Sequence, residues 1–165
     1  MRIYISKIFQ EIIDFIFPPK KEEIILRALS WQSFLQKVKT AEKLEFPYIH
    51  SLLSYKDPLV KELIWQIKYR KNKNAVTIAS HILYDWLCRN NYKNSTLIPI
   101  PISKKRRKER GFNQTELIID EIIKLDKENY FIKDYKILTR EKDLSSIYLM
   151  NYPIYYPSTC QFFWL

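Results

Sequence analysis

Residues 96–125 constrain the fold of this chain more than any other stretch. They begin with a short apolar run, residues 97–102, which is bounded by turn residues and is typical of a buried parallel strand. Pro99 and Pro101 interrupt the run, so we expect its end at the rim of a sheet. A block of cations comes next, and an amphipathic stretch follows it. The predicted order is therefore strand, basic loop, helix.

The amphipathic stretch is predicted to be a helix that starts at Asn113. Asn113 and Glu116 have the spacing of a capping box, in which a side chain satisfies a free N–H group of the first helical turn. The predicted core-facing side chains have helical spacing: Leu117, Ile118, Ile122 and Leu125.

The predicted junction between loop and helix favours an anion. A helix N-terminus presents unpaired N–H groups and a positive dipole end. Residues 104–110 add six cations and one Glu, about half of the chain's net charge of +10, which predicts phosphate-bearing partners. Gly111 is the only glycine in the chain, and we expect a positive φ there that lets the backbone approach a ligand. Phosphate or pyrophosphate is the predicted occupant.

Residues 99–117, PIPISKKRRKERGFNQTEL, resemble the signature of the ComF family (competence protein F-like) of type I phosphoribosyltransferase-like proteins. In that family a strand ending in P-x-P-x is followed by basic residues, by R-E-R-G-F-N-Q or a close variant, and by a helix. Residues 55–69, YKDPLVKELIWQIKY, extend the similarity upstream. A basic run also occurs as a solvated turn or a nuclear-type targeting signal, but Gly-Phe-Asn-Gln is not expected after a generic one.

The resemblance implies that the basic loop binds phosphoribosyl pyrophosphate or pyrophosphate. The implied binding residues are Ser103, Lys104, Lys105, Arg106, Arg107, Arg110, Gly111, Asn113 and Gln114. The alternative is a non-catalytic single-stranded DNA-binding protein of natural transformation, with the DNA-uptake helicase machinery as a partner. The same cations would then follow a phosphate backbone. Trp31, Trp65 and Trp86 could stack on bases, although tryptophans at helical spacing are more often core.

The catalytic loop of the family is not recognisable in this chain. A type I phosphoribosyltransferase needs two acidic residues followed by a Thr-Gly loop that cradles the 5-phosphate. With its one glycine at position 111 the chain lacks that loop, and Asp120 and Glu121 read as solvated helix positions. We therefore expect an inactive protein whose catalytic residues are unknown. Mg²⁺ with phosphoribosyl pyrophosphate is expected only for an intact family member.

The expected fold class is α/β, with an incomplete type I phosphoribosyltransferase-like parallel sheet flanked by helices. Three regions are predicted: an N-terminal helical region over 1–45, a partial phosphoribosyltransferase-like domain over 46–143, and an uncharged aromatic tail over 144–165. The tail is typical of a frameshift product that follows a truncated family domain, or of a segment that tends to pair with other strands. Because Pro153 and Pro157 oppose regular pairing, we expect it to be loose and to leave the strand at Leu97 with an open edge.

Apolar spacing predicts the remaining elements. Helices are expected near residues 5–16, 22–38, 57–69 and 75–87, and strands over 46–55 and 130–139. The first helix should pack on its own domain rather than on a membrane surface. His50 is expected to face solvent or a polar partner.

The two cysteines, Cys88 and Cys160, exclude a disulfide framework and a cysteine zinc site. Many ComF relatives carry a zinc module after a Phe-Pro-Pro segment. Here Pro19 is followed by Lys20 and Lys21, so the chain is expected to lack that module. No signal peptide or membrane span is recognisable, and a reducing cytoplasm is the expected location.

Overall fold

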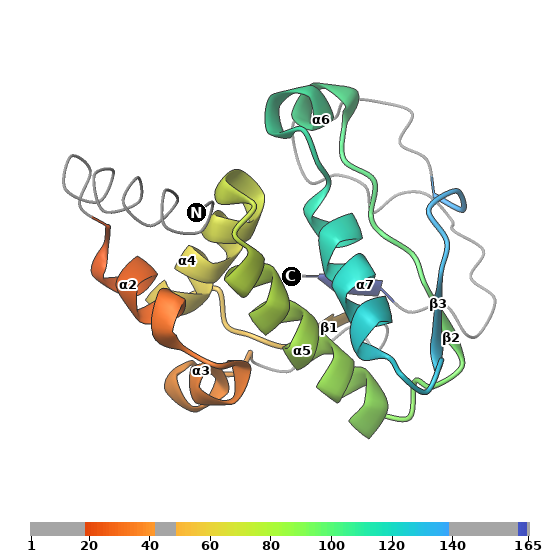
Figure 1. Ribbon diagram of the computed structural model, residues 1–165, viewed down its shortest axis with the longest axis horizontal. Helices are drawn as coiled ribbons and strands as arrows, with labels where there is room; N and C mark the ends of the chain where they lie inside the picture. The colour runs from red at the N-terminus through yellow and green to blue at the C-terminus, as the bar shows by residue number, and fades with distance from the viewer. Residues whose placement is uncertain (1–18, 42–48, 139–161, 165) are drawn as a thin grey trace, which may run out of the picture.

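The computed structural model of the chain describes residues 19–41, 49–138 and 162–164. Its helices and strands follow one another along the chain (Figure 1). They are α2 (Lys21–Ala28), α3 (Trp31–Lys37), β1 (Ile49–Ser51), α4 (Pro58–Trp65), the π-helix η1 (Gln66–Arg70), α5 (Lys73–Arg89), β2 (Ser95–Leu97), α6 (Lys104–Arg110), α7 (Gln114–Leu125), β3 (Phe131–Lys133) and β4 (Phe162–Trp164).

The described strands form two small parallel sheets. β2 pairs with β3, with Ser95 opposite Phe131, and β1 pairs with β4, with Ile49 opposite Phe162. The fold is therefore mixed α/β with parallel pairing, as the sequence predicts at that level. The described residues contain no helix that is both long enough and apolar enough to cross a membrane.

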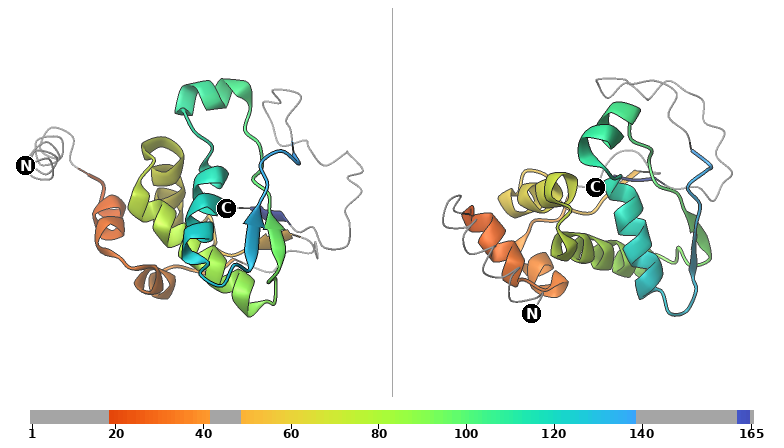
Figure 2. Two further views of the ribbon diagram at one scale, coloured as in Figure 1. Left: turned by 45° about the vertical axis from the view of Figure 1, so that its right-hand side comes forward. Right: turned by 45° about the horizontal axis from the view of Figure 1, so that its top comes forward.

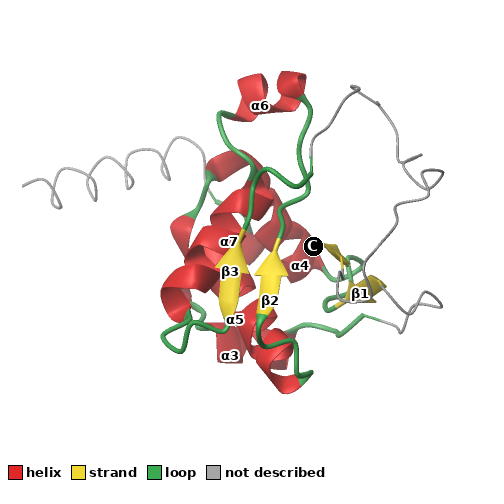
Figure 3. Ribbon diagram, turned by 90° about the vertical axis from the view of Figure 1, so that its right-hand side faces the viewer, coloured by secondary structure: helices red, strands yellow, loops and turns green. Residues whose placement is uncertain are grey.

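Helices α5 and α7 cover one face of the β2–β3 pair (Figures 2 and 3). Leu97 and Phe131 are buried, whereas Ile132 is 66% exposed, because successive strand residues point to opposite faces. The two helices are joined by a buried hydrogen bond, in which Ser80 Oγ donates to the carbonyl oxygen of Ile118 at 3.1 Å.

One cluster of buried side chains connects the N-terminal helices with the sheet. It includes Leu26 of α2 and Phe34 of α3, continues through α4 and α5, and reaches Ile122 of α7 and Phe131 of β3. The helices before residue 45 therefore share their core with the α/β part of the chain.

The helix predicted over residues 22–38 is instead two helices. Leu29 has ψ 138°, an extended conformation, and the Ser30 hydroxyl accepts a hydrogen bond from the backbone N–H of Ser33 at 3.2 Å. This N-cap starts α3 as a new helix. Apolar spacing continues across the break, so spacing alone did not reveal it.

The predicted helices over 57–69 and 75–87 are confirmed, and their starts have identifiable caps. Asp57 accepts a hydrogen bond from Leu59 N at 2.9 Å, with Pro58 in the first helical position. Asn72 accepts one from Ala75 N at 3.2 Å. Between the two helices, Lys71 adopts a left-handed conformation with φ 51° and ends η1.

The strands are shorter than predicted. The run over 97–102 was expected to be a strand, but β2 ends at Leu97, because the prolines at 99 and 101 cannot donate ladder hydrogen bonds. β3 covers only three of the residues predicted over 130–139, and β1 three of those over 46–55. Residues 46–48 and 139 lie outside the described part of the chain.

The expectation that the whole tail is unpaired is wrong for Phe162–Trp164. These residues form β4 and pair with β1, not with the strand that ends at Leu97. They follow both tail prolines, and aromatic residues suit strands, so nothing local prevents pairing there. Residues 144–161 and the predicted helix over 5–16 lie outside the described residues.

Replacing Ile122 with Ala should lower the free energy of unfolding by about 2–5 kcal/mol, because Ile122 is fully buried in the shared core. Urea denaturation followed by circular dichroism measures this. The control is Ile132→Ala on the exposed face, which should change stability by less than about 0.5 kcal/mol. Equal destabilisation by the two substitutions would contradict this packing of α7.

Candidate functional site

Residues 104–110, predicted as a loop, form helix α6. The Ser103 hydroxyl is buried and accepts a hydrogen bond from Arg106 N at 3.2 Å, which is an N-cap. Lys, Arg and Glu are good helix formers, so a run of them after a capping Ser is locally helical. The backbone N–H of Arg107 bonds to the carbonyl oxygen of Ser103 at 2.8 Å, as expected at the start of a regular helix.

Gly111 has φ 75°, as the sequence predicts, and the reason is the end of α6. Its N–H donates to the carbonyl of Arg107 at 2.8 Å, and the left-handed residue stops the helix. A Cβ at this position would meet no atom within 4 Å. Conformation, rather than crowding, therefore favours glycine here.

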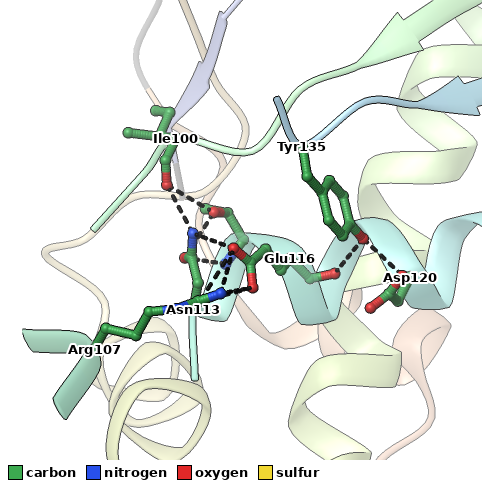
Figure 4. A network of polar contacts seen from close by, with 7 residues as sticks. Ile100, Arg107, Asn113, Glu116, Asp120 and Tyr135 are labelled. Carbon is green, nitrogen blue, oxygen red and sulfur yellow. Dashed lines mark hydrogen bonds and ion pairs between the residues drawn. The ribbon is translucent and has the colours of Figure 1, made fainter. Parts of the chain in front are cut away.

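Asn113 is the N-cap of α7, as predicted, and its side chain is buried (Figure 4). Its Oδ1 accepts from Thr115 N at 3.1 Å, and its Nδ2 donates to the carbonyl oxygen of Ile100 at 3.0 Å. The Thr115 hydroxyl donates to the same carbonyl oxygen at 3.1 Å. The Asn113 side chain thus joins the chain after β2 to the first turn of α7.

Arg107 and Glu116 form a bidentate ion pair between α6 and α7 (Figure 4). The two terminal guanidinium nitrogens, Nη1 and Nη2, lie 3.0–3.2 Å from the two carboxylate oxygens. Such a pair is directional as well as attractive, so it orients α6 against α7. Glu116, predicted as part of a capping box, pairs mainly with Arg107 in this structure.

Arg110 connects α6 with η1. Its Nη1 donates to Gln114 Oε1 at 3.1 Å, and its Cζ lies 5.1 Å from the ring centroid of Tyr69. Tyr69 belongs to η1, so the two basic helices meet at this contact.

A second group of cations, on η1, was not among the predicted site residues. Burial lowers the pKa of Lys68, and the nearby charges of Arg110 and Arg106 lower it further. Lys71 Nζ lies 5.5 Å from the Phe112 ring, directly after α6. The available sequence signal was the run Lys68-Tyr69-Arg70-Lys71 at the end of a helix.

We call Lys68, Arg106 and Arg110 the basic surface.

The structure places the predicted site residues in three ways. Ser103 and Asn113 are buried in caps, and Gln114 is half-buried beside Arg110. Gly111 is exposed at the end of α6, and so are the four cations at its start: Lys104, Lys105, Arg106 and Arg107. Of the predicted residues, Arg106 and Arg110 are the two whose charges act on Lys68.

Asp120 and Glu121, expected to be solvated, are half-buried and paired. Asp120 binds the Lys133 ammonium and accepts a hydrogen bond from the Tyr135 hydroxyl at 2.6 Å (Figure 4). Partial burial would raise the pKa of Asp120, but the hydrogen bonds from Lys133 and Tyr135 lower it. Glu121 pairs with Lys124 at 2.9 Å. Asp120 therefore holds β3 and the residues after it against α7.

The described part of the chain contains no cluster of three or more His, Cys, Asp or Glu side chains that could hold a metal ion. His50 is half-buried, with its ring 4.9 Å from Trp86 and 6.3 Å from Tyr92, rather than facing open solvent. His81 stacks on Trp31 at 5.6 Å.

Comparison of the chain with protein-family models, with curated proteins and with solved structures finds no match.

Replacing Asn113 with Ala should lower the free energy of unfolding by about 1–3 kcal/mol, because the cap of α7 and the bond to Ile100 are lost together. Asn113→Ser is the matched variant: it keeps a capping oxygen but lacks the amide that donates to Ile100. We expect serine to recover part of the stability in urea denaturation. No difference between serine and the wild type would mean that the Ile100 bond contributes nothing.

Proposed function

We propose that this chain binds a phosphate-bearing ligand, phosphoribosyl pyrophosphate or pyrophosphate, at the basic surface. The proposal follows the resemblance to the ComF family in residues 99–117. It rests on one observation: the guanidinium of Arg110 on α6 lies 5.1 Å from the ring centroid of Tyr69, which follows Lys68 on η1, so the cations of the two helices come together. Lys68 belongs to η1 and the two arginines to α6, so three cations from two segments far apart in sequence are gathered at one surface.

The electrostatics favour an anion at this surface. Like charges raise each other's free energy, and a bound phosphate would relieve that repulsion and raise the pKa of Lys68. Glu116, the acidic residue in the first turn of α7, is already paired with Arg107. The location is also suitable: α6 lies beyond the carboxyl ends of the parallel strands β2 and β3 (Figure 3). Ligands of open α/β sheets bind at that end.

We further propose that the fold is an incomplete form of the type I phosphoribosyltransferase-like fold. The support is the parallel β2–β3 pair, the crossing through α6 and α7 between these strands, and the helices on one face. A cytoplasmic location is part of the same proposal.

Single-stranded DNA is the second candidate ligand, and the rings beside the cations favour it. Tyr69 is 58% exposed beneath Arg110, and Phe112 lies against Lys71. Proteins that bind single strands combine such cations with rings on which bases stack. If single-stranded DNA is the ligand, we propose a role in DNA uptake with the helicase machinery as a partner.

The isolated chain should show no Mg²⁺-dependent turnover of phosphoribosyl pyrophosphate with nucleobases or with pyrophosphate. Its only glycine ends α6, so no Thr-Gly loop is available to hold the 5-phosphate. A coupled pyrophosphate-release assay tests this, with an active phosphoribosyltransferase as the positive control. Measurable turnover would contradict the prediction.

Neutralising the basic surface with Lys68→Gln, Arg106→Gln and Arg110→Gln should weaken pyrophosphate binding measured by calorimetry. With a short single strand, the logarithmic salt slope should fall by roughly one for each phosphate that the protein no longer neutralises. We choose Lys68 rather than Arg107, because Arg107 is paired with Glu116. Since the fold disfavours protonated Lys68, its replacement should not reduce stability near neutral pH.

The matched control is Lys37→Gln, Lys127→Gln and Lys136→Gln, which removes three exposed cations away from the basic surface. It changes net charge equally, so it corrects for general attraction. An equal reduction of affinity in the two triple variants would place the binding site elsewhere.

A further inference from the structure

An open pocket of about 380 Å³ lies beside the basic surface. Its walls come from the start of α2, from α4 with the turn before it, and from η1. The side chains able to stack on a ligand or attract an anion there are Lys20, Tyr55, Lys61, Trp65, Lys68 and Tyr69. A volume of this size is in the range of small-molecule sites.

The pocket presents aromatic rings that carry cations. Tyr55 is 61% exposed and Trp65 39% exposed, so both rings are accessible to a ligand. Lys61 Nζ lies 6.0 Å from the Tyr55 centroid, and Arg70 Cζ lies 5.3 Å from that of Trp65. Rings of this kind can stack on a planar ligand, while the cations beside them attract an anionic group.

Two residues belong to both the pocket and the surroundings of Arg110. Lys68 lines the pocket and is influenced by the charges of Arg110 and Arg106. Tyr69 lines the pocket and lies under the guanidinium of Arg110. A ligand with a planar part in the pocket would therefore have its anionic part at the basic surface.

The pocket also contains two carboxylates, Glu22 and Glu62. Glu62 is buried and accepts a hydrogen bond from Gln66 Nε2 at 2.9 Å. Carboxylates repel a bare pyrophosphate, but they accept hydrogen bonds from amino or imino groups. The lining thus suits a base in the pocket better than a second phosphate.

We propose that this pocket binds the aromatic base of a nucleotide whose phosphate is held by Lys68, Arg106 and Arg110. The inference rests on the proposed function, because it uses the same basic surface, and it specifies the ligand as a nucleotide. The nucleotide is either free or part of a strand, and the chemistry of base and phosphate is common to both.

The test compares AMP with ribose 5-phosphate, which has the same sugar and phosphate but no base, by calorimetry on the full chain. AMP should bind at least about fivefold more tightly, the lower end of the contribution of one stacked base. Tyr55→Leu should abolish that advantage, and Tyr55→Phe should keep it. Because Tyr55 is exposed, neither change should prevent folding.

Equal affinities for AMP and ribose 5-phosphate, or an advantage that survives Tyr55→Leu, would overturn the inference. Pyrophosphate, titrated in parallel, distinguishes this failure from failure of the proposed function: pyrophosphate binding without preference for AMP leaves the proposed function intact. A short oligo(dA) separates the two sources. Tighter binding of the oligonucleotide than of AMP assigns the base to a strand, and equal binding assigns it to a free nucleotide.

Discussion

The arrangement around α6 depends on the buried side-chain amide of Asn113. The amide connects the carbonyl of Ile100, just after β2, with the first turn of α7. The segment after β2 and the start of α7 are thereby held together, and α6 lies in the connection between them. Because a buried amide without partners is costly, this geometry is strongly favoured. The position of the cations thus follows largely from an uncharged group, and the Arg107–Glu116 pair then orients α6.

The structure contains two contrasting groups of charged side chains, one in which opposite charges pair and one in which like charges gather. On the side of β3, Asp120 is matched by Lys133 and Tyr135, and these hydrogen bonds lower its pKa. On η1, by contrast, burial lowers the pKa of Lys68, and the charges of Arg110 and Arg106 lower it further. The first arrangement stabilises the fold above the acid range, whereas the second costs stability in the absence of an anion. This gathering of like charges is the electrostatic basis of the binding surface that we propose.

Local signals in the sequence predicted the starts of the helices at Asp57 and Asn113 and the positive φ of Gly111, because each depends on atoms within a few residues. The cap at Ser30 and the helical state of residues 104–110 also depend on local sequence. They were not predicted, because apolar spacing continues across Ser30 and because the dense charge of residues 104–110 suggested a loop. By contrast, the approach of Lys68 to Arg106 and the pairing of β4 with β1 join distant segments. The run Lys68-Tyr69-Arg70-Lys71 marks a second basic segment in the sequence, but propensity and periodicity carry no information about its contact with α6.

The cations can gather because of where they lie along their helices. Lys68 and Arg70 are in the last turn of η1, and Arg107 and Arg110 are in the last turn of α6. Each helix ends at a left-handed residue, Lys71 or Gly111. A helix C-terminus carries partial negative charge, so it offsets some of the repulsion between cations placed there. The sequence suggested an anion at the N-terminus of α7, but the folded chain concentrates positive side chains at two helix C-termini. A ligand at this surface would therefore be held by side chains rather than by a rigid backbone cradle.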